Sequence, residues 1–374
     1  MLSETDEYIR ELTQKKGLPY VDVVAYKDHE QIYRYFCGDG REKITGKEKL
    51  YMYSATKPVT AVCAMKLWED GLISFDDKIT KWLPEYGEAY VRREDGTCEK
   101  CGADITVLNL LTMTSGGFLY TSQYPIGETV AENGGKEDTR TIVKAFPKVP
   151  LIEKPGVQFN YGLSHDILAA IIEQVSGKKF SEYAREKVFE PLGMQNSTFD
   201  YLAEGICTQY NADENGKMTK VTNTAGEHWF AYGKEYESGG AGLVSTVEDY
   251  AIFADALACG GAGKHGRILK PETVRQFSKE RLENLVVKND FTCYQGVDYG
   301  YGLGVRVRTK PTEWGLPKGE FGWDGAAGSY VMVDPVNHIS VFIGLHIGMW
   351  IYVFLEEHLN IVKKIYENVL NIKQ

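Results

Sequence analysis

A serine and a lysine stand three residues apart in the segment YMYSATKPVT, residues 51–60, as Ser54 and Lys57. A serine hydroxyl becomes a nucleophile when a nearby base takes its proton, and a lysine that has lost its charge can be that base. Residues three apart on a helix share a face, so the amine could reach the hydroxyl. The same spacing also fits a serine that only caps a helix, since serine is a favoured N-cap residue.

The chain contains this spacing a second time, at Ser176 and Lys179. Ser176 follows the apolar run ILAAIIEQV and precedes Gly177, a pattern that predicts the C-terminal end of a helix. Backbone carbonyls and the negative end of the helix dipole point toward such a place, which disfavours an oxyanion there. We therefore interpret Ser176 and Lys179 as structural.

Ser54 is predicted at the opposite end of a helix. It follows the strand-like KLYMY and precedes ATKPVTAVCAMKLWEDG, in which Pro58 falls in the first turn and Gly71 marks the end. Free amide N–H groups and the positive end of the dipole stabilise negative charge at this place. Helix polarity thus favours Ser54 over Ser176 as a nucleophile.

Strands are predicted near both ends of the chain. Ser3 and Asp6 form a capping pair that predicts an N-terminal helix. The alternating segment 20–38, with KDHE in its middle, predicts a β-hairpin. Strand-like segments return after residue 298 as YGYGLGVRVR, GSYVMVDP and HISVFIGLH, and an amphipathic helix follows them.

Helices and loops dominate the middle of the chain. Terminal strands that pair with each other would form one α/β lobe from about residues 1–73 and 234–374. The segment of about 74–233 would then form a mostly helical lobe. The stretch 339–355 is the most apolar, but it is short for a membrane span and contains glycines, so we predict a buried strand, a turn and a helix.

Composition and charge exclude some classes of function. The 374 residues are 43% hydrophobic and 25% charged, which is ordinary for a soluble globular protein. A net charge of −10 argues against binding to nucleic acid or to an anionic membrane surface. The chain begins acidic and lacks the apolar segment of a signal peptide, so we expect a cytoplasmic protein.

The cysteines give no sign of a disulfide framework. There are seven, an odd number, and they are scattered, which fits a reducing compartment. Cys98 and Cys101 form one C-x-x-C pair after the turn-like segment 94–97, but no second pair of ligands lies nearby. We predict free thiols on the return strand of a hairpin, and we expect no metal and no cofactor.

SATK and five further segments together resemble the class C β-lactamase-related family. This family of serine hydrolases includes family VIII carboxylesterases, D-aminopeptidases and DD-carboxypeptidases. In order, the segments are GLISFDDKITKWLPEY, ITVLNLLTMTSGG, PGVQFNYGLSHDILAAIIEQVSG, GGAGLVSTVEDYAIFADAL and FGWDGAAGSYVMVDP. The resemblance covers most of the chain. It implies a β-lactamase/transpeptidase-like fold over 1–374, with an antiparallel sheet flanked by terminal helices and a helical lobe.

The resemblance also implies roles for single residues and two departures from the family pattern. Tyr161 matches the tyrosine that faces the serine and carries a proton to the leaving group. Leu163 stands where the family has an asparagine that supports the lysine. Trp323, Asp324 and Gly325 stand where the family has K-T-G or H-x-G, so the cation that pairs with a penicillin carboxylate is lost.

Ala326 follows this element, and its N–H would form an oxyanion hole with the N–H of Ser54. An acyl-enzyme on Ser54 would be the intermediate. Whether Lys57 or Tyr161 is the base stays open, because the two would titrate as a coupled pair.

The departures point to an enzyme that acts on small esters. Leu163 and Trp323 make the site more apolar and less cationic, which favours a carboxylesterase or acyltransferase. The alternatives are a β-lactamase, DD-peptidase or D-aminopeptidase, in which Arg306 or Arg308 would replace the missing cation, and a non-catalytic penicillin-binding-like protein. The expected partner is a small-molecule ester or amide. The acyl group, the leaving group and the oligomeric state stay open.

Overall fold

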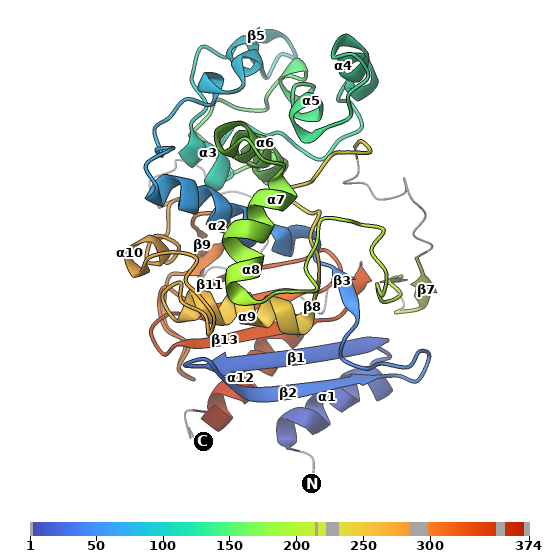
Figure 1. The fold of residues 1–374 in the computed structure, drawn as a ribbon. Coiled ribbons are helices and arrows are strands. Elements are labelled where there is room, and N and C mark those ends of the chain that lie inside the picture. The colour runs from blue at the N-terminus through green and yellow to red at the C-terminus, as the bar shows by residue number, and fades with distance from the viewer. Residues whose placement is uncertain (1–2, 214–215, 222–231, 284–297, 349–355, 370–374) are drawn as a thin grey trace.

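The computed structural model describes residues 3–213, 216–221, 232–283, 298–348 and 356–369 (Figure 1). The strands of its main sheet are β1 (Tyr20–Lys27), β2 (Glu30–Gly38), β9 (Tyr299–Tyr301), β10 (Arg306–Arg308), β11 (Phe321–Asp324), β12 (Tyr330–Asp334) and β13 (Ile339–Gly344). Their order in the sheet is β2-β1-β13-β12-β11-β10-β9, and every neighbouring pair is antiparallel. The N-terminal hairpin therefore pairs with strands from the end of the chain, as predicted.

Shorter strands form three small sheets. They pair β3 (Lys49–Tyr51) with β8 (Val244–Thr246), β4 (Tyr90–Arg92) with β5 (Cys98–Lys100), and β6 (Tyr210–Ala212) with both β7 (Met218–Lys220) and β14 (Ile347–Gly348). The β4–β5 hairpin confirms the strand predicted around Cys98, and Cys98 and Cys101 are free thiols. Residues 339–348 form β13 and β14 as strands, while 349–355 lie outside the described residues.

Two helices cover one face of the main sheet. These are α1 (Glu4–Gln14) and α12 (His358–Val369), drawn below the sheet in Figure 1. Ser3 and Asp6 form the predicted capping box at the start of α1. Apolar side chains of both helices, such as Ile9 and Ile365, pack with Val21 and Val23 of β1 into one buried cluster. The antiparallel sheet flanked by terminal helices is confirmed.

The other face of the sheet is covered by α9 (Val247–Ala258), which contacts β1, β12 and β13. Tyr250 of α9 stacks on Phe342 of β13 with ring centroids 4.3 Å apart. The helix α2 (Thr56–Glu69) lies near this layer and packs against α6 (Ser164–Ser176), so nearly all of α2 is buried. A helix buried on all sides is a place where a charged side chain costs free energy unless it finds partners.

The remaining helices are short, and α3, α4 and α5 lie above the sheet in Figure 1. They are α3 (Val107–Leu111), α4 (Ile126–Glu132), α5 (Thr139–Val143), α7 (Phe180–Ala184), α8 (Glu190–Leu192) and α10 (Pro271–Val274), with the 3₁₀ turns η1 (Tyr53–Ala55), η2 (Ile79–Lys81), η3 (Pro84–Glu88) and η4 (Phe146–Lys148) and the π-turn η5 (Arg185–Phe189). No helix among the described residues is long and apolar enough to cross a bilayer.

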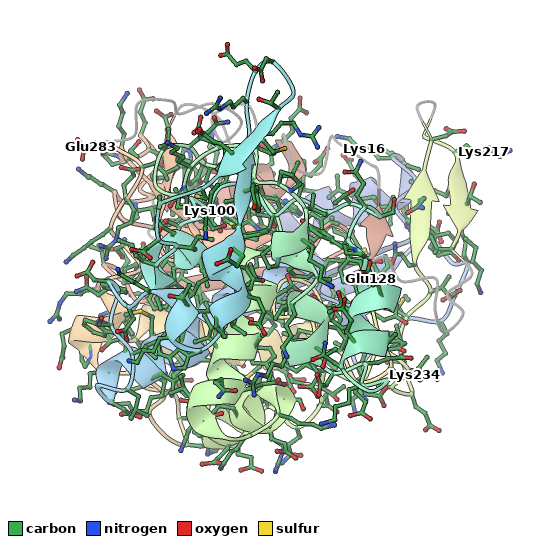
Figure 2. The ribbon with its side chains drawn as sticks, turned by 90° about the horizontal axis from the view of Figure 1, so that it is seen from above. Lys16, Lys100, Glu128, Lys217, Lys234 and Glu283 are labelled. Atoms are coloured by element: carbon green, nitrogen blue, oxygen red, sulfur yellow. The ribbon has the colours of Figure 1, made fainter. Side chains whose placement is uncertain are left out.

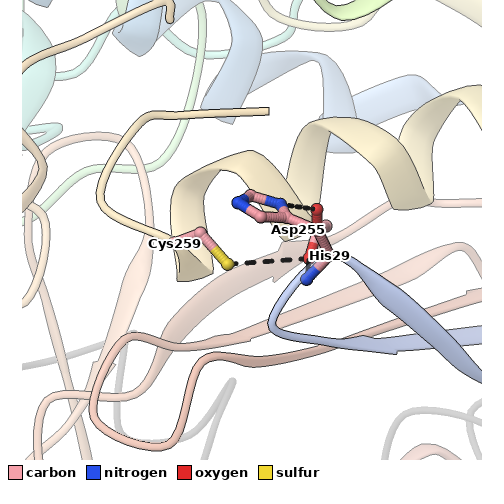
Figure 3. Close-up of side chains that lie close together, drawn as sticks. All are labelled: His29, Asp255 and Cys259. Carbon is pink, nitrogen blue, oxygen red and sulfur yellow. Dashed lines mark hydrogen bonds and ion pairs between the residues drawn. The ribbon is translucent and has the colours of Figure 1, made fainter. Parts of the chain in front are cut away.

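A carboxylate fixes the turn of the β1–β2 hairpin to α9 (Figure 3). Asp255 accepts the backbone N–H of His29 at 3.2 Å, lies 2.7 Å from its Nδ1, and also accepts the thiol of Cys259. Asp28 and His29 have φ values of 49° and 67°, the positive values that a tight two-residue hairpin turn requires. Among the described residues, this is the group whose ligand atoms lie close enough to hold a metal. Burial raises the pKa of Cys259 to about 12, which opposes the thiolate that a metal requires, so we interpret the group as an anchor.

Asp255→Asn is expected to lower the free energy of unfolding by about 1–2 kcal/mol, because an amide replaces one of the two acceptor oxygens that serve the His29 N–H, His29 Nδ1 and the Cys259 thiol. Urea denaturation measures the change, with Glu30→Gln on the exposed start of β2 as the control. EDTA should leave the wild-type midpoint unchanged. A lower midpoint in EDTA, restored by zinc, would instead identify a metal site.

Candidate active site

Ser54 lies in η1, between the end of β3 and the start of α2. The preceding Tyr53 has a φ of 45°, an uncommon backbone conformation for a bulky residue that gathers at functional sites. The N-cap of α2 is Ala55, and no side chain caps this helix. The Ser54 hydroxyl instead accepts a hydrogen bond from Lys57 Nζ at 3.0 Å. Ser54 is therefore not a capping serine.

Lys57 is completely buried, and its amine has three neighbours that accept hydrogen bonds. Nζ donates to Ser54 Oγ at 3.0 Å, to the Tyr120 hydroxyl at 3.1 Å and to the Gly240 carbonyl at 2.8 Å. An ammonium group has three N–H donors, so these contacts satisfy it. A carbonyl cannot donate, so once the amine has lost a proton its lone pair must accept a hydrogen bond from the Ser54 or the Tyr120 hydroxyl.

The environment of Lys57 also sets its charge. Burial lowers the pKa of the amine to about 7, and the nearby carboxylate of Asp166 partly opposes this shift. Asp166 accepts hydrogen bonds from the Tyr236 hydroxyl at 2.5 Å and from Ser238 Oγ at 2.6 Å. Near neutral pH a substantial fraction of Lys57 is thus uncharged, as a base must be.

The chain passes between α2 and α6 at two glycines, Gly239 and Gly240. A Cβ on Gly239 would lie 2.3 Å from the His165 carbonyl, and one on Gly240 would lie 2.5 Å from Asp166 Oδ2. Thr60 of α2 donates to the Gly239 carbonyl at 2.6 Å. Glycine is required here, because any side chain would push away the segment whose carbonyl meets Lys57.

Tyr161 presents its ring, rather than its hydroxyl, to the lysine. Lys57 Nζ lies 4.6 Å from the ring centroid, a cation–π distance. The hydroxyl accepts a hydrogen bond from Trp323 Nε1 at 3.0 Å, and the two rings are 5.5 Å apart. The tyrosine hydroxyl bonded to Lys57 belongs to Tyr120.

The other residues expected to contact substrate are mostly buried. Leu163 and Trp323 are each 1% exposed, so their side chains offer a bound molecule almost no surface. Trp323 lies among Phe159, Tyr301 and other aromatic residues. The geometry favours an indirect role for Trp323, which orients Tyr161 through the indole N–H.

Asp324 and the two arginines considered as substitute cations form a buried ion cluster. Arg306 lies 2.9 Å from Asp324 and 3.5 Å from Glu320, and it also donates to the Val331 carbonyl at 2.8 Å. Arg308 pairs with the same Glu320 at 3.5 Å. Because these charges neutralise one another inside the sheet, neither arginine is available to replace the missing cation.

The loop after β11 comes close to the nucleophile turn. A Cβ on Gly325 would lie 2.3 Å from the Met52 carbonyl, and Ser329 Oγ donates to that carbonyl at 3.2 Å. Ala326 is exposed, and within the described part of the chain its N–H donates to no backbone carbonyl. The loop is thus held against the turn that carries Ser54.

Sequence reasoning missed Tyr120, Asp166 and Gly240 as members of this site. Tyr120 comes three residues after the TSGG segment, Asp166 three residues after Leu163, and Gly240 is the second residue of GGAGLVSTVEDY. Each is in or next to a segment that carried the family resemblance. The glycine pair and the acidic residue in a nearly apolar helix were the available signals, but neither indicates a lysine as the partner.

Comparisons with known proteins agree with this fold. The family model described as Beta-lactamase matches residues 5–346. A putative D-alanyl-D-alanine carboxypeptidase of Escherichia coli K12 is 25% identical and covers 91% of this chain and 81% of its own. Acyltransferase calJ of Penicillium decumbens is 27% identical and covers 74% and 71%. The solved structure of EstCE1, a hydrolase with promiscuous acyltransferase activity, superposes with a TM-score of 0.76 at 21% identity and covers 97% of both chains.

The reaction of Ser54 with a fluorophosphonate is expected to accelerate as the pH rises, with an apparent pKa near 7, because only the uncharged amine can take the serine proton. Asp166→Asn removes the carboxylate that raises the lysine pKa, so its midpoint should move to lower pH. Inactivation rate constants between about pH 5 and 9 measure both midpoints. Asp255→Asn, the same change far from the lysine, is the control. A midpoint that moves upward in Asp166→Asn would contradict this assignment.

Proposed function

Because the chain belongs to the beta-lactamase family, whose members are serine hydrolases and acyltransferases, we propose that it cleaves or transfers the acyl group of small carboxylic esters. The observation that carries the proposal is the 3.0 Å contact between Ser54 Oγ and the buried amine of Lys57. A buried amine with a lowered pKa is an expensive arrangement that a structural lysine does not need.

In the proposed reaction, Ser54 Oγ forms a bond to the carbonyl carbon while its proton passes to Lys57 Nζ. The N–H groups of Ser54 and Ala326 bind the oxyanion. When the intermediate collapses, the bond to the alcohol breaks and the alcohol oxygen takes the proton by way of a tyrosine hydroxyl. Water or a second alcohol then attacks the acyl-enzyme. Water gives hydrolysis, and an alcohol gives acyl transfer.

Two hydroxyls are candidates for the proton path. Tyr120 is hydrogen-bonded to Lys57 at 3.1 Å, and Tyr161 matches the tyrosine of the family pattern and lies beside the amine. The ring centroids of Tyr120 and Tyr161 are 6.3 Å apart. The two phenols and the amine therefore form one coupled set, in which a proton lost by one group changes the others.

The surroundings of the site support esters over β-lactams. The family pattern places a cation where this chain has Trp323, and an amide where it has Leu163. The nearby arginines Arg306 and Arg308 are paired with carboxylates in the sheet, so they do not restore the positive charge. The related carboxypeptidase makes peptidase activity the second candidate.

A fluorophosphonate probe is expected to label Ser54 and to leave Ser176 unmodified. Ser54 faces the buried amine, whereas Ser176 ends α6, whose C-cap Gly177 has a φ of 70°. Mass spectrometry of the labelled peptides locates the adduct, and Ser54→Ala is the control. An adduct on Ser176, or a folded protein that takes up no label, would exclude this mechanism.

Short-chain esters are expected to react at least about a hundredfold faster than a cephalosporin. A lost carboxylate–cation contact costs about 1.5–3 kcal/mol and a lost amide hydrogen bond about 1 kcal/mol of transition-state binding. The test compares kcat/KM for 4-nitrophenyl butyrate and nitrocefin in one preparation. Equal or faster turnover of nitrocefin would favour the β-lactamase alternative.

A further inference from the structure

We infer that the natural substrate carries an apolar group that ends in a negative charge, and that this part binds in a pocket beside the catalytic lysine. The inference rests on the proposed function and deepens it. The pocket has a volume of about 560 Å³ and lies between the β4–β5 hairpin, the segment 117–124 and the segment 149–152. This volume falls within the range of about 300–1,000 Å³ that is typical of small-molecule sites. We call it the Arg92 pocket.

The Arg92 pocket adjoins the site at Tyr120. This side chain forms part of the pocket wall, and its hydroxyl lies 3.1 Å from Lys57 Nζ. Lys57 in turn lies 3.0 Å from Ser54 Oγ. A substrate whose ester carbonyl reaches Ser54 can thus extend past Tyr120 into the pocket.

The part of the wall next to Tyr120 is apolar. Leu119 is 39% exposed and Ile152 is 46% exposed, although both are large hydrophobic residues. Tyr124 lines the same pocket. A Cβ on Gly117 would lie only 3.0 Å from Ile152 Cδ1, so the absence of a side chain at Gly117 lets the two segments meet. Exposed apolar side chains gathered in one hollow favour an apolar ligand group.

The β4–β5 side of the pocket carries charged side chains. Arg92, Arg93 and Glu94 all line it. Arg93 forms an ion pair with Glu99 across the hairpin, which offsets its charge. Among the described residues, no carboxylate lies within ion-pair distance of Arg92. In a chain with a net charge of −10, this guanidinium at the end of an apolar pocket is suited to a carboxylate, phosphate or sulfate, which it can bind with two parallel hydrogen bonds.

The backbone holds Arg92 in this place. Its N–H donates to the Leu151 carbonyl at 2.9 Å, and the Leu151 N–H donates to the Tyr90 carbonyl at 2.7 Å. β4 is therefore fixed to the segment that contains Ile152. Figure 2 looks down on this hairpin, which projects from the helical part of the molecule. It also labels Lys100, a cation on β5 that pairs with Glu88 and does not line the pocket.

The test compares matched esters that differ by one charge. 4-Nitrophenyl hydrogen adipate and 4-nitrophenyl methyl adipate place the charge, or its neutral counterpart, on the acyl side. 4-Carboxyphenyl butyrate and its methyl ester place it on the alcohol side. We expect kcat/KM to favour the charged member of one pair by about two- to fivefold, the effect of a solvent-exposed ion pair, and the preference to shrink at high salt.

Variants then locate the charge that is responsible. Arg92→Gln should abolish the preference and Arg92→Glu should reverse it, mainly through KM. Arg93→Gln should change it less, because Glu99 already offsets that charge. Lys100→Gln removes a cation from the same hairpin and should leave the preference intact. All three positions are on an exposed hairpin, and circular dichroism verifies that each of the four variants is folded.

4-Nitrophenyl butyrate, which is small and neutral, separates this inference from the proposed function. If the enzyme fails to cleave the butyrate and every other ester, the proposed function is wrong and the inference falls with it. If it cleaves the butyrate but prefers neither charged ester, or if Arg92→Glu keeps the wild-type preference, the inference alone is overturned.

Discussion

A fully buried lysine amine is the constraint on which the rest of this site depends. A charged or even neutral amine inside a protein costs several kcal/mol unless its donors are satisfied. The hydrogen bonds of Lys57 to a serine hydroxyl, a tyrosine hydroxyl and a backbone carbonyl offset this cost. Burial that lowers its pKa to about 7 also makes it a base. Burial thus destabilises the charged amine of Lys57 and, by lowering its pKa, also lets it act as a base.

Each of these partners comes from a different part of the chain. Ser54 is in the turn before α2, Tyr120 follows α3, and Gly240 precedes β8. The Gly240 carbonyl reaches the amine only because Gly239 and Gly240 lack side chains that would strike α6. Packing in the helical part and the strand pairing below it must therefore both be correct before the base is in place.

The ion cluster in the sheet explains how the site can be apolar although arginines are near. Arg306 and Arg308 share Glu320, and Arg306 also holds Asp324 at the end of β11. The cluster fixes the strand end that leads to Gly325, and Gly325 packs on the Met52 carbonyl beside the nucleophile turn. The positive charges of Arg306 and Arg308 thus hold the backbone at the end of β11 in position. Arg92, which has no carboxylate within ion-pair distance among the described residues, instead lines the pocket beside Tyr120.

Local patterns in the sequence determined the elements and the identity of the serine. The capping pair at Ser3, the hairpin over 20–38 and the glycine after Ser176 depend on residues close together in the chain, and short-range hydrogen bonds and helix polarity decide them. Helix polarity is also what separated Ser54 from Ser176.

Only the tertiary structure decided which groups meet the lysine and which charges cancel. Tyr120, Asp166 and Gly240 lie 63, 109 and 183 positions after Lys57, and no periodicity links residues so far apart. The sequence likewise left Arg306 as a candidate substrate cation, because its pairing with Glu320 and Asp324 depends on the packing of β10 and β11. Contacts across such distances depend on how whole elements pack, and packing is a property of the assembled chain.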